Sequence, residues 1–227
     1  MWQKNQTPMC GRYTIAAPPE ELRRRFDVQL PEEDFQPNFN AAPTQNLPVI
    51  RQESGKTLDL FKWGLVPFWA KEASIGNKMI NARAESVFEK PAFKQAIHKR
   101  RCLVPATGFF EWKVVNGKKE PFYIRPGATD HLFVFAGIWE KWDRRDGQPL
   151  YTFSILTKEA EGEIASLHHR MPVILPQEAE DDWLQTTSQK EMQDLINAAT
   201  HKEWEYHQVS RKVNAPSNND QSLIRPL

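Results

Sequence analysis

Short runs of alternating apolar and polar residues recur along the chain, and turn residues separate most of them. Such alternation is typical of strands that bury one face. Segments 49–51 and 57–63 flank Ser54-Gly55-Lys56. Segments 110–115 and 121–124 flank Asn116-Gly117, a dipeptide favoured in tight hairpins. Further strands are expected at 102–105, 131–142, 150–156, 171–175 and 205–209. The pattern therefore predicts hairpins and a largely antiparallel sheet.

Helical patterns fill the gaps between groups of strands. Pro18-Pro19 followed by Glu20-Glu21 suits a helix start, because proline is tolerated in the first turn and acidic residues favour the positive end of the helix dipole. Other helical segments are expected before His98, at 159–167, at 177–185 and at 189–198, and the tail from Asn214 is expected to be irregular. With no linker or repeat, the order predicts a single α+β domain, with a largely antiparallel sheet or open β-barrel and flanking helices.

Composition narrows the class of protein. The chain has 227 residues, of which 40% are hydrophobic and 26% charged, with a net charge of +1. No apolar run approaches the ~20 residues of a membrane span, and the polar start lacks the core of a secretory signal. Two cysteines imply no disulfide framework, which fits the reducing cytoplasm. We also expect the protein to be a monomer. A near-neutral chain would contact nucleic acid only through a local patch.

Large aromatic residues gather beside glycine and proline. Segment 63–69 reads Trp-Gly-Leu-Val-Pro-Phe-Trp, and we interpret it as a loop carrying three large rings. Loops are ordinarily polar, and exposed rings are how unpaired bases are held by stacking. The segment therefore either packs in the core or binds single-stranded nucleic acid.

Cys10 follows Met9 and precedes Gly11-Arg12. If the preceding residues are removed, Cys10 carries an α-amine and a thiol on adjacent carbons. The α-amine has a pKa of about 7.7–8.0, so a useful fraction is a neutral nucleophile at pH 7. The amine can then condense with an aldehyde, and the thiol can close a thiazolidine ring. The alternative is an ordinary internal cysteine, and for Cys102 we expect burial in the core.

Further candidate groups each have a plainer interpretation. An inward-facing Glu111 would have a raised pKa suited to acid–base work, whereas an outward-facing one would pair with Lys113 or Lys119. His168 is either a proton shuttle or a structural histidine. Asn81 and Arg83 would share one side of an extended segment, where Asn81 could bind a reacting oxygen and Arg83 a phosphate. Otherwise they would cap a helix and pair with Glu85.

Six motifs then occur in an order that resembles the SRAP family of abasic-site processing proteins. They are Met-Cys-Gly-Arg at 9–12, Asn-Ala-Ala-Pro at 40–43, Trp-Gly-Leu-Val-Pro at 63–67, Asn-Ala-Arg-Ala-Glu at 81–85, Gly-Phe-Phe-Glu-Trp at 108–112 and His-His-Arg-Met-Pro at 168–172. The late segment 209–214 also resembles that family. The resemblance implies one SRAP domain over 10–227 and an N-terminal extension, 1–9, that is absent or removed in the active form.

The resemblance also implies a function. Family members act on abasic sites in single-stranded DNA, often near a junction with duplex, and form a thiazolidine cross-link through the terminal cysteine during the DNA damage response. A thiol autopeptidase activity at Met9–Cys10 and residence in the cytoplasm, on the nucleoid when bound to DNA, are implied as well, with no cofactor or metal. By carry-over, the catalytic residues are Cys10, Asn81, Glu111 and His168. The DNA-binding residues are Arg12, Arg83, Arg170, Pro43, Trp63 and Phe68.

The chain departs from the family pattern at His169, where Asp is usual, and in the residues before Met9. A retained extension would turn the α-amine into an amide and prevent thiazolidine chemistry. Two other functions stay open at this point: an N-terminal-nucleophile cysteine amidohydrolase, and a non-covalent single-stranded DNA-binding module.

Overall fold

The computed structural model describes residues 11–31, 35–127, 131–143, 147–201 and 203–227. Met9 and Cys10, which we expect to be the site of processing and the nucleophile, lie outside these residues. The strands are β1 (Tyr13–Ile15), β2 (Asn38–Ala41), β3 (Asn46–Gln52), β4 (Lys56–Trp63), β5 (Asn81–Arg83), β6 (Arg101–Ala106), β7 (Gly108–Val115), β8 (Lys118–Pro126), β9 (Phe133–Asp143), β10 (Pro149–Glu159), β11 (Arg170–Pro172), β12 (Ile174–Leu175) and β13 (Trp204–Gln208).

Five of these strands pair in a closed ring. Strand β10 pairs with β4 in parallel and with β9 in the antiparallel sense, and β4, β3, β6 and β9 pair in succession. Strands β5, β11 and β12 extend this eight-stranded sheet. The predicted α+β domain with a largely antiparallel sheet is confirmed, and the β10 pairings close the ring instead of leaving it open.

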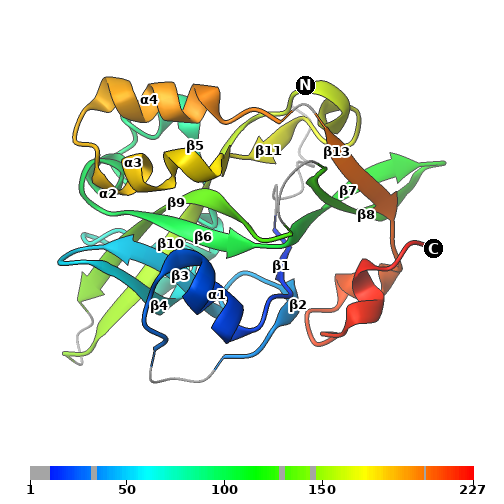
Figure 1. Ribbon diagram of the computed structural model, residues 1–227, viewed down its shortest axis with the longest axis horizontal. Helices are drawn as coiled ribbons and strands as arrows, with labels where there is room; N and C mark the ends of the chain where they lie inside the picture. Colours follow the sequence, from blue (N-terminus) through cyan, green and yellow to red (C-terminus); the bar gives the residue numbers. More distant parts are fainter. Residues whose placement is uncertain (1–10, 32–34, 128–130, 144–146, 202) are drawn as a thin grey trace.

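A second sheet, in the order β13-β8-β7-β1-β2, lies beside the ring (Figure 1). Aromatic contacts join the two sheets, since the ring of Tyr13 on β1 meets Trp63 edge-on at 5.1 Å and Phe135 at 5.7 Å. One large apolar core therefore spans both sheets. Edge-to-face aromatic pairs add to the stabilisation from burial alone.

Helices cover the outside of the ring. The α-helices are α1 (Pro19–Phe26), α2 (Lys94–Lys99), α3 (Glu180–Gln185) and α4 (Gln189–Ala198). Figure 1 shows α2, α3 and α4 together on one side, while α1 lies away from them near β3. Helix α1 begins after Pro18 with Glu20 and Glu21 in its first turn, as predicted. No helix among the described residues is long and apolar enough to cross a membrane.

The predicted hairpins are confirmed in β3–β4 and β7–β8. In the second, Asn116 and Gly117 both have positive φ, as a tight turn requires. Two segments differ from the expectation. A continuous strand at 171–175 was expected, but Val173 crosses between β10 and β9 and separates β11 from β12. The expected helix at 159–167 shortens to a 3₁₀ helix, Gly162–Ser166, because β10 continues to Glu159.

The C-terminal segment is more ordered than an irregular tail. It contains short 3₁₀ helices at Arg211–Asn214 and Gln221–Ile224. Val213 and Leu223 are fully buried in a small second core with Phe110 and Tyr123. Figure 1 shows this segment beneath β8 and beside β2.

Candidate active site

Glu111 and His168 come together although they are far apart in the sequence. Along β7, Phe110 faces the small second core, so the alternation of a strand turns Glu111 to the opposite side. Its side chain is 4% exposed, and Oε1 lies 4.0 Å from Nδ1 of His168. The inward-facing interpretation of Glu111 is therefore confirmed. A distance of 4.0 Å is longer than a hydrogen bond but allows charge interaction.

The main chain of Arg170 surrounds Nδ1 of His168. The Arg170 N–H donates to Nδ1 at 3.2 Å, and the Arg170 carbonyl oxygen lies 3.3 Å from the same nitrogen. Nδ1 therefore has a partner with or without a proton. Burial lowers the pKa of His168 below its ordinary value, so the imidazole is neutral near pH 7 and can accept a proton.

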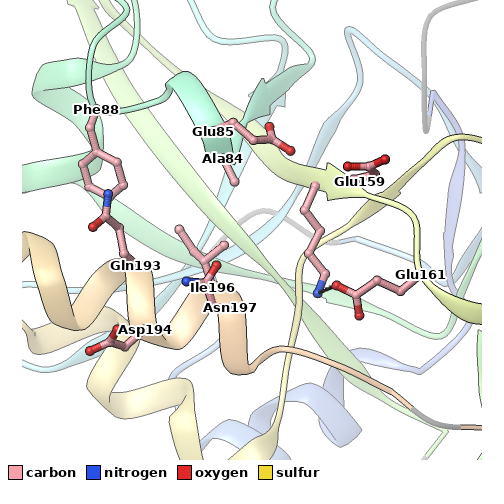
Figure 2. A pocket seen from close by; sticks show the side chains of 10 residues that line it. Ala84, Glu85, Phe88, Glu159, Glu161, Gln193, Asp194, Ile196 and Asn197 are labelled. Carbon is pink, nitrogen blue, oxygen red and sulfur yellow. Dashed lines mark hydrogen bonds and ion pairs between the residues drawn. The ribbon is translucent and has the colours of Figure 1, made fainter.

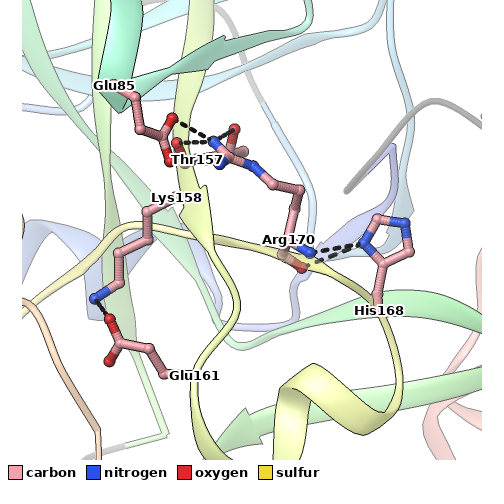
Figure 3. Close-up of polar contacts among 6 residues, drawn as sticks. All are labelled: Glu85, Thr157, Lys158, Glu161, His168 and Arg170. Carbon is pink, nitrogen blue, oxygen red and sulfur yellow. Dashed lines mark hydrogen bonds and ion pairs between the residues drawn. The ribbon is translucent and has the colours of Figure 1, made fainter.

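Figure 3 shows how Arg170 itself is fixed. Its guanidinium pairs with both carboxylate oxygens of Glu85, with Nη2 at 2.9 Å from Oε2, and Nη2 also donates to the Thr157 carbonyl at 2.6 Å. Partial burial favours the neutral acid, but the hydrogen bonds from Arg170 hold the pKa of Glu85 below its ordinary value. The contact spans three strands of one sheet, since Glu85 follows β5, Thr157 lies on β10 and Arg170 begins β11.

Asn81 and Arg83 lie on β5, which pairs in parallel with β10. The extended interpretation of this segment is confirmed, so the two side chains share one side of the strand. Asn81 is half-buried and Arg83 is exposed. This exposure leaves Arg83 accessible to an anionic ligand.

Arg12 is half-buried, and its guanidinium binds protein oxygens. Nη1 donates to Oδ1 of Asn40 at 2.7 Å and to the Val213 carbonyl at 2.8 Å, and burial lowers the pKa of Arg12. Its own carbonyl accepts a hydrogen bond from the Phe110 N–H at 2.9 Å, which places the chain just after Cys10 beside β7. Arg12 and Arg170 are thus bound to protein oxygens, whereas phosphate contact was the role expected for both.

The aromatic segment 63–69 divides into a buried and an exposed part. Trp63 ends β4, is fully buried and donates from Nε1 to the Ile80 carbonyl at 2.8 Å. Its expected role in stacking on a base is therefore wrong for this structure, because Tyr13 and Phe153 occupy the space around the ring. Phe68 is 54% exposed and Trp69 is 49% exposed.

The loop that carries Phe68 is anchored at its base. Val66 N–H donates to Oγ1 of Thr152 at 2.9 Å, and Nε1 of Trp142 donates to the Ala70 carbonyl at 2.8 Å. The turn containing Pro43 adjoins this segment, since Thr44 N–H donates to the Trp63 carbonyl at 2.9 Å. Half-buried Pro43 and the two exposed rings therefore belong to neighbouring loops. Trp69 was not among the predicted DNA-binding residues, although it belongs to the ring-rich segment 63–69 that suggested stacking on bases.

A cavity of about 500 Å³ lies between β10 and α4 and has Glu85 in its wall (Figure 2). Its other acidic lining residues are Glu159, Glu161 and Asp194, with Lys158 paired to Glu161 at 2.7 Å. Carboxylates repel phosphate, so this cavity does not suit a DNA strand. Among the described residues, no three His, Cys, Asp or Glu side chains are grouped as metal ligands.

The sequence was compared with known protein families and with individual proteins. The SOS response associated peptidase (SRAP) family matches residues 9–216. The chain is 42% identical over 222 residues to abasic site processing protein YoaM of Bacillus subtilis, covering 95% of this chain and 97% of that one. It is 30% identical over 264 residues to abasic site processing protein HMCES of Gallus gallus, covering 96% and 78%.

A crystal structure of a protein from Bacteroides thetaiotaomicron has the same fold, with a TM-score of 0.85 at 28% identity. The match covers 96% of this chain and 100% of that one. Both the family match and these relatives span nearly the whole chain. The chain therefore belongs to the SOS response associated peptidase (SRAP) family.

Proposed function

We propose that this protein recognises abasic sites in single-stranded DNA and captures them as a thiazolidine through Cys10. The observation that carries the proposal is the buried Glu111 beside His168, next to the chain segment that leads to Cys10, in a family whose relatives are named for abasic-site processing. The ring-opened abasic sugar supplies the aldehyde. The site needs only an amine, a thiol and groups that move protons.

The reaction proceeds in balanced steps. The Cys10 amine adds to the aldehyde carbon, and the resulting carbinolamine loses water to give a Schiff base. The thiol then adds to the same carbon, forming the C–S bond and leaving a secondary amine. The net products are one thiazolidine and one water.

Each neighbouring side chain has a separate role in these steps. Glu111 donates the proton that leaves with the hydroxyl group and later accepts the thiol proton. Neutral His168 accepts the proton of the sugar hydroxyl as the ring opens. Asn81 orients the aldehyde oxygen. Arg83 holds a phosphate, while Arg12 and Arg170 belong to the framework of the site.

Cys10 must carry a free amine for this chemistry. We therefore propose that the active form begins at Cys10, and that the Cys10 thiol cuts the Met9–Cys10 bond when residues precede it. The thiol attacks the Met9 carbonyl, the amide C–N bond breaks to free the Cys10 amine, and water hydrolyses the resulting thioester to release the extension. A Cys10→Ala variant that keeps the whole extension, beside a wild-type chain that loses it, would support self-processing. Loss of the extension from both chains would assign the cleavage to another enzyme.

Intact mass spectrometry tests the function. The protein is incubated with a short single strand carrying one abasic site and then denatured. We expect a species that begins at Cys10 and is heavier by the oligonucleotide less one water. Cys10→Ala should form none, and Glu111→Gln should slow its formation about 10²–10⁴-fold, the usual contribution of a positioned acid–base group.

Other outcomes would separate the remaining functions. A processed protein that binds the strand but forms no adduct would indicate a non-covalent binding module. Glutamine hydrolysis by the processed protein without any adduct would indicate an amidohydrolase. Either result would overturn the proposal.

The exposed rings should contribute to binding the strand. Stacking on a base is worth about 1–3 kcal/mol, so Phe68→Ala and Trp69→Ala should each weaken binding of a single strand by roughly that free energy. Fluorescence anisotropy of a labelled oligonucleotide measures the dissociation constants. Val114→Ala is the matched control, because Val114 is 64% exposed on the β7–β8 hairpin. Equal affinities for all three variants would show that the loop carrying Phe68 and Trp69 does not contact the strand.

A further inference from the structure

The C-terminal strap, which we define as residues 209–224, is held to the site by two side chains. Asn40 is fully buried, and its Nδ2 lies within hydrogen-bond distance of three strap carbonyls: Val213 at 3.3 Å, Ala215 at 3.0 Å and Asn218 at 2.8 Å. Nη1 of Arg12 donates to the Val213 carbonyl and to Oδ1 of Asn40. Arg12 and Asn40 thus form one connected hydrogen-bond network with the strap.

Further hydrogen bonds join the strap to β2 and to β7, the strand that carries Glu111. The Phe39 N–H on β2 donates to Oδ1 of Asn219 at 2.7 Å. On β7, Nε1 of Trp112, the neighbour of Glu111, donates to Oδ1 of Asn214 at 2.9 Å. The strap continues past residue 216, where the family match ends, so part of this attachment lies beyond the matched region.

The network restricts Arg12 from two sides. Its carbonyl is bound by the Phe110 N–H of β7, and its guanidinium is bound by Asn40 and the strap. Only Gly11 separates Arg12 from Cys10. The position of Arg12 therefore limits the space that the Cys10 amine and thiol can reach relative to Glu111. A displacement of about 1 Å at a reacting group can cost a hundredfold in rate.

We propose that Arg12 and Asn40 are positioning residues that use the C-terminal strap to hold Gly11 and Arg12, the residues that follow Cys10, beside β7. This inference rests on the proposed function, since the reaction being positioned is the cross-link. It assigns Arg12 a role inside the protein instead of a contact with a DNA phosphate. Asn40 supplies further amide donors to the strap carbonyls of Ala215 and Asn218, beside the bond that Arg12 makes to Val213.

The test separates rate from DNA affinity. Intact protein carrying the free Cys10 amine is mixed with saturating abasic-site oligonucleotide, and the single-turnover rate of adduct formation is measured. Affinity for the same strand without the lesion is measured over a series of salt concentrations. Arg12→Met and Asn40→Ala should each lower the rate tenfold or more. The double variant should lose little beyond the larger single loss, because both side chains act through one network.

The salt series distinguishes positioning from phosphate contact. One phosphate contact on a single strand changes the slope of log K against log salt by about 0.7. Arg12→Met should keep the wild-type slope, as should Arg24→Met, which removes an exposed arginine of α1. If Arg12→Met loses about 0.7 of slope and reacts at the wild-type rate when saturated, Arg12 is a phosphate ligand and the proposal fails.

Hydrogen exchange provides a readout that needs no DNA. Asn40→Asp keeps an acceptor for Arg12 but replaces the amide donors with oxygen, so strap residues 210–224 should exchange at least tenfold faster while β3–β4 stays protected. If strap amides exchange in Asn40→Asp as slowly as in the wild type, the proposal that Asn40 holds the strap is wrong. This outcome is decisive even if Asn40→Ala fails to fold. If the wild-type protein forms no cross-link, the proposed function fails, and faster strap exchange would still show that Asn40 holds the strap.

Discussion

At the residue scale, the protonation of His168 depends on its immediate neighbours. Burial is the main cause that lowers the pKa of His168, and electrostatic repulsion from the neighbouring basic side chains of His169 and Arg170 lowers it further. The rings of His168 and His169 lie 4.4 Å apart between centroids. His169 thus acts on His168 in the opposite direction to a carboxylate at the same position.

Replacing His169 should therefore change the titration of His168. His169→Asp places a negative charge beside the imidazole, which favours its protonated form and raises the pKa of His168. His169→Asn removes the ionisable ring without adding a negative charge, so it should raise this pKa by less. NMR titration of the His168 ring protons measures both. The wild-type midpoint should lie below the ordinary value of 6.5, and a lower midpoint in His169→Asp than in wild type would contradict the argument.

Individual burial was the least predictable property at this scale. Trp63 and Phe68 belong to one ring-rich segment, yet Trp63 is fully buried and Phe68 is 54% exposed. The segment has no regular period, so its sequence does not specify which ring faces the core. Contacts from β1 and β10 decide this.

At the scale of elements, β7 and β8 pack with no spare volume where they meet β1. A Cβ placed on Gly108 would lie 2.2 Å from the ring of Tyr123. Tyr123 donates to the Thr107 carbonyl at 2.8 Å and contacts Oγ1 of Thr14 at 3.4 Å. Glycine at 108 therefore allows Tyr123 of β8 to bind Thr14 of β1 and Thr107 just before β7.

Gly108→Ala should displace Tyr123 and lower the free energy of unfolding by about 1–3 kcal/mol, the usual cost of overpacking. Gly55→Ala is the matched control, because a Cβ there meets no atom within 4 Å and its φ is not in the left-handed region. The control should be neutral or slightly stabilising. Urea denaturation measures both variants, and equal midpoints would show that Tyr123 adjusts without cost.

Local and distant pairings differ in how far the sequence predicts them. The β3–β4 and β7–β8 hairpins follow from alternation and turn residues in adjacent segments. The parallel pairings of β10 with β4 and β5 join segments about 70–90 residues apart. No local pattern specifies such partners, so the closed ring was not predicted.

At the scale of the whole molecule, Arg101 joins the helical layer to the ring of strands. Its buried side chain begins on β6 and donates to carbonyls at the ends of two helices. Nη1 reaches Ile97 of α2 at 2.8 Å, and Nε reaches Trp183 of α3 at 2.6 Å. A cation is favourable at the negative ends of helices, and burial lowers the pKa of Arg101 to about 10, so it stays charged at pH 7.

Arg101→Met should therefore destabilise the entire fold. The substitution removes the donors that several buried carbonyls use. Each unpaired buried carbonyl costs about 1–3 kcal/mol, so we expect the free energy of unfolding to fall by at least about 3 kcal/mol. Arg24→Met, on the exposed side of α1, should change it by less than about 0.5 kcal/mol. Chemical denaturation measures both, and a loss below about 1 kcal/mol for Arg101→Met would show that the helix ends find other donors.

Local sequence patterns were enough to predict the α+β class, the two hairpins, the four main helices and the residues with the right chemistry for a site. Those features depend on local periodicity, turn residues and side-chain type. Long-range packing, by contrast, brings Glu111 to His168, places Trp63 in the core, and binds Arg12 and Asn40 to the C-terminal strap. These outcomes depend on which distant strands pair and on which buried carbonyls need donors, and both are properties of the packed molecule.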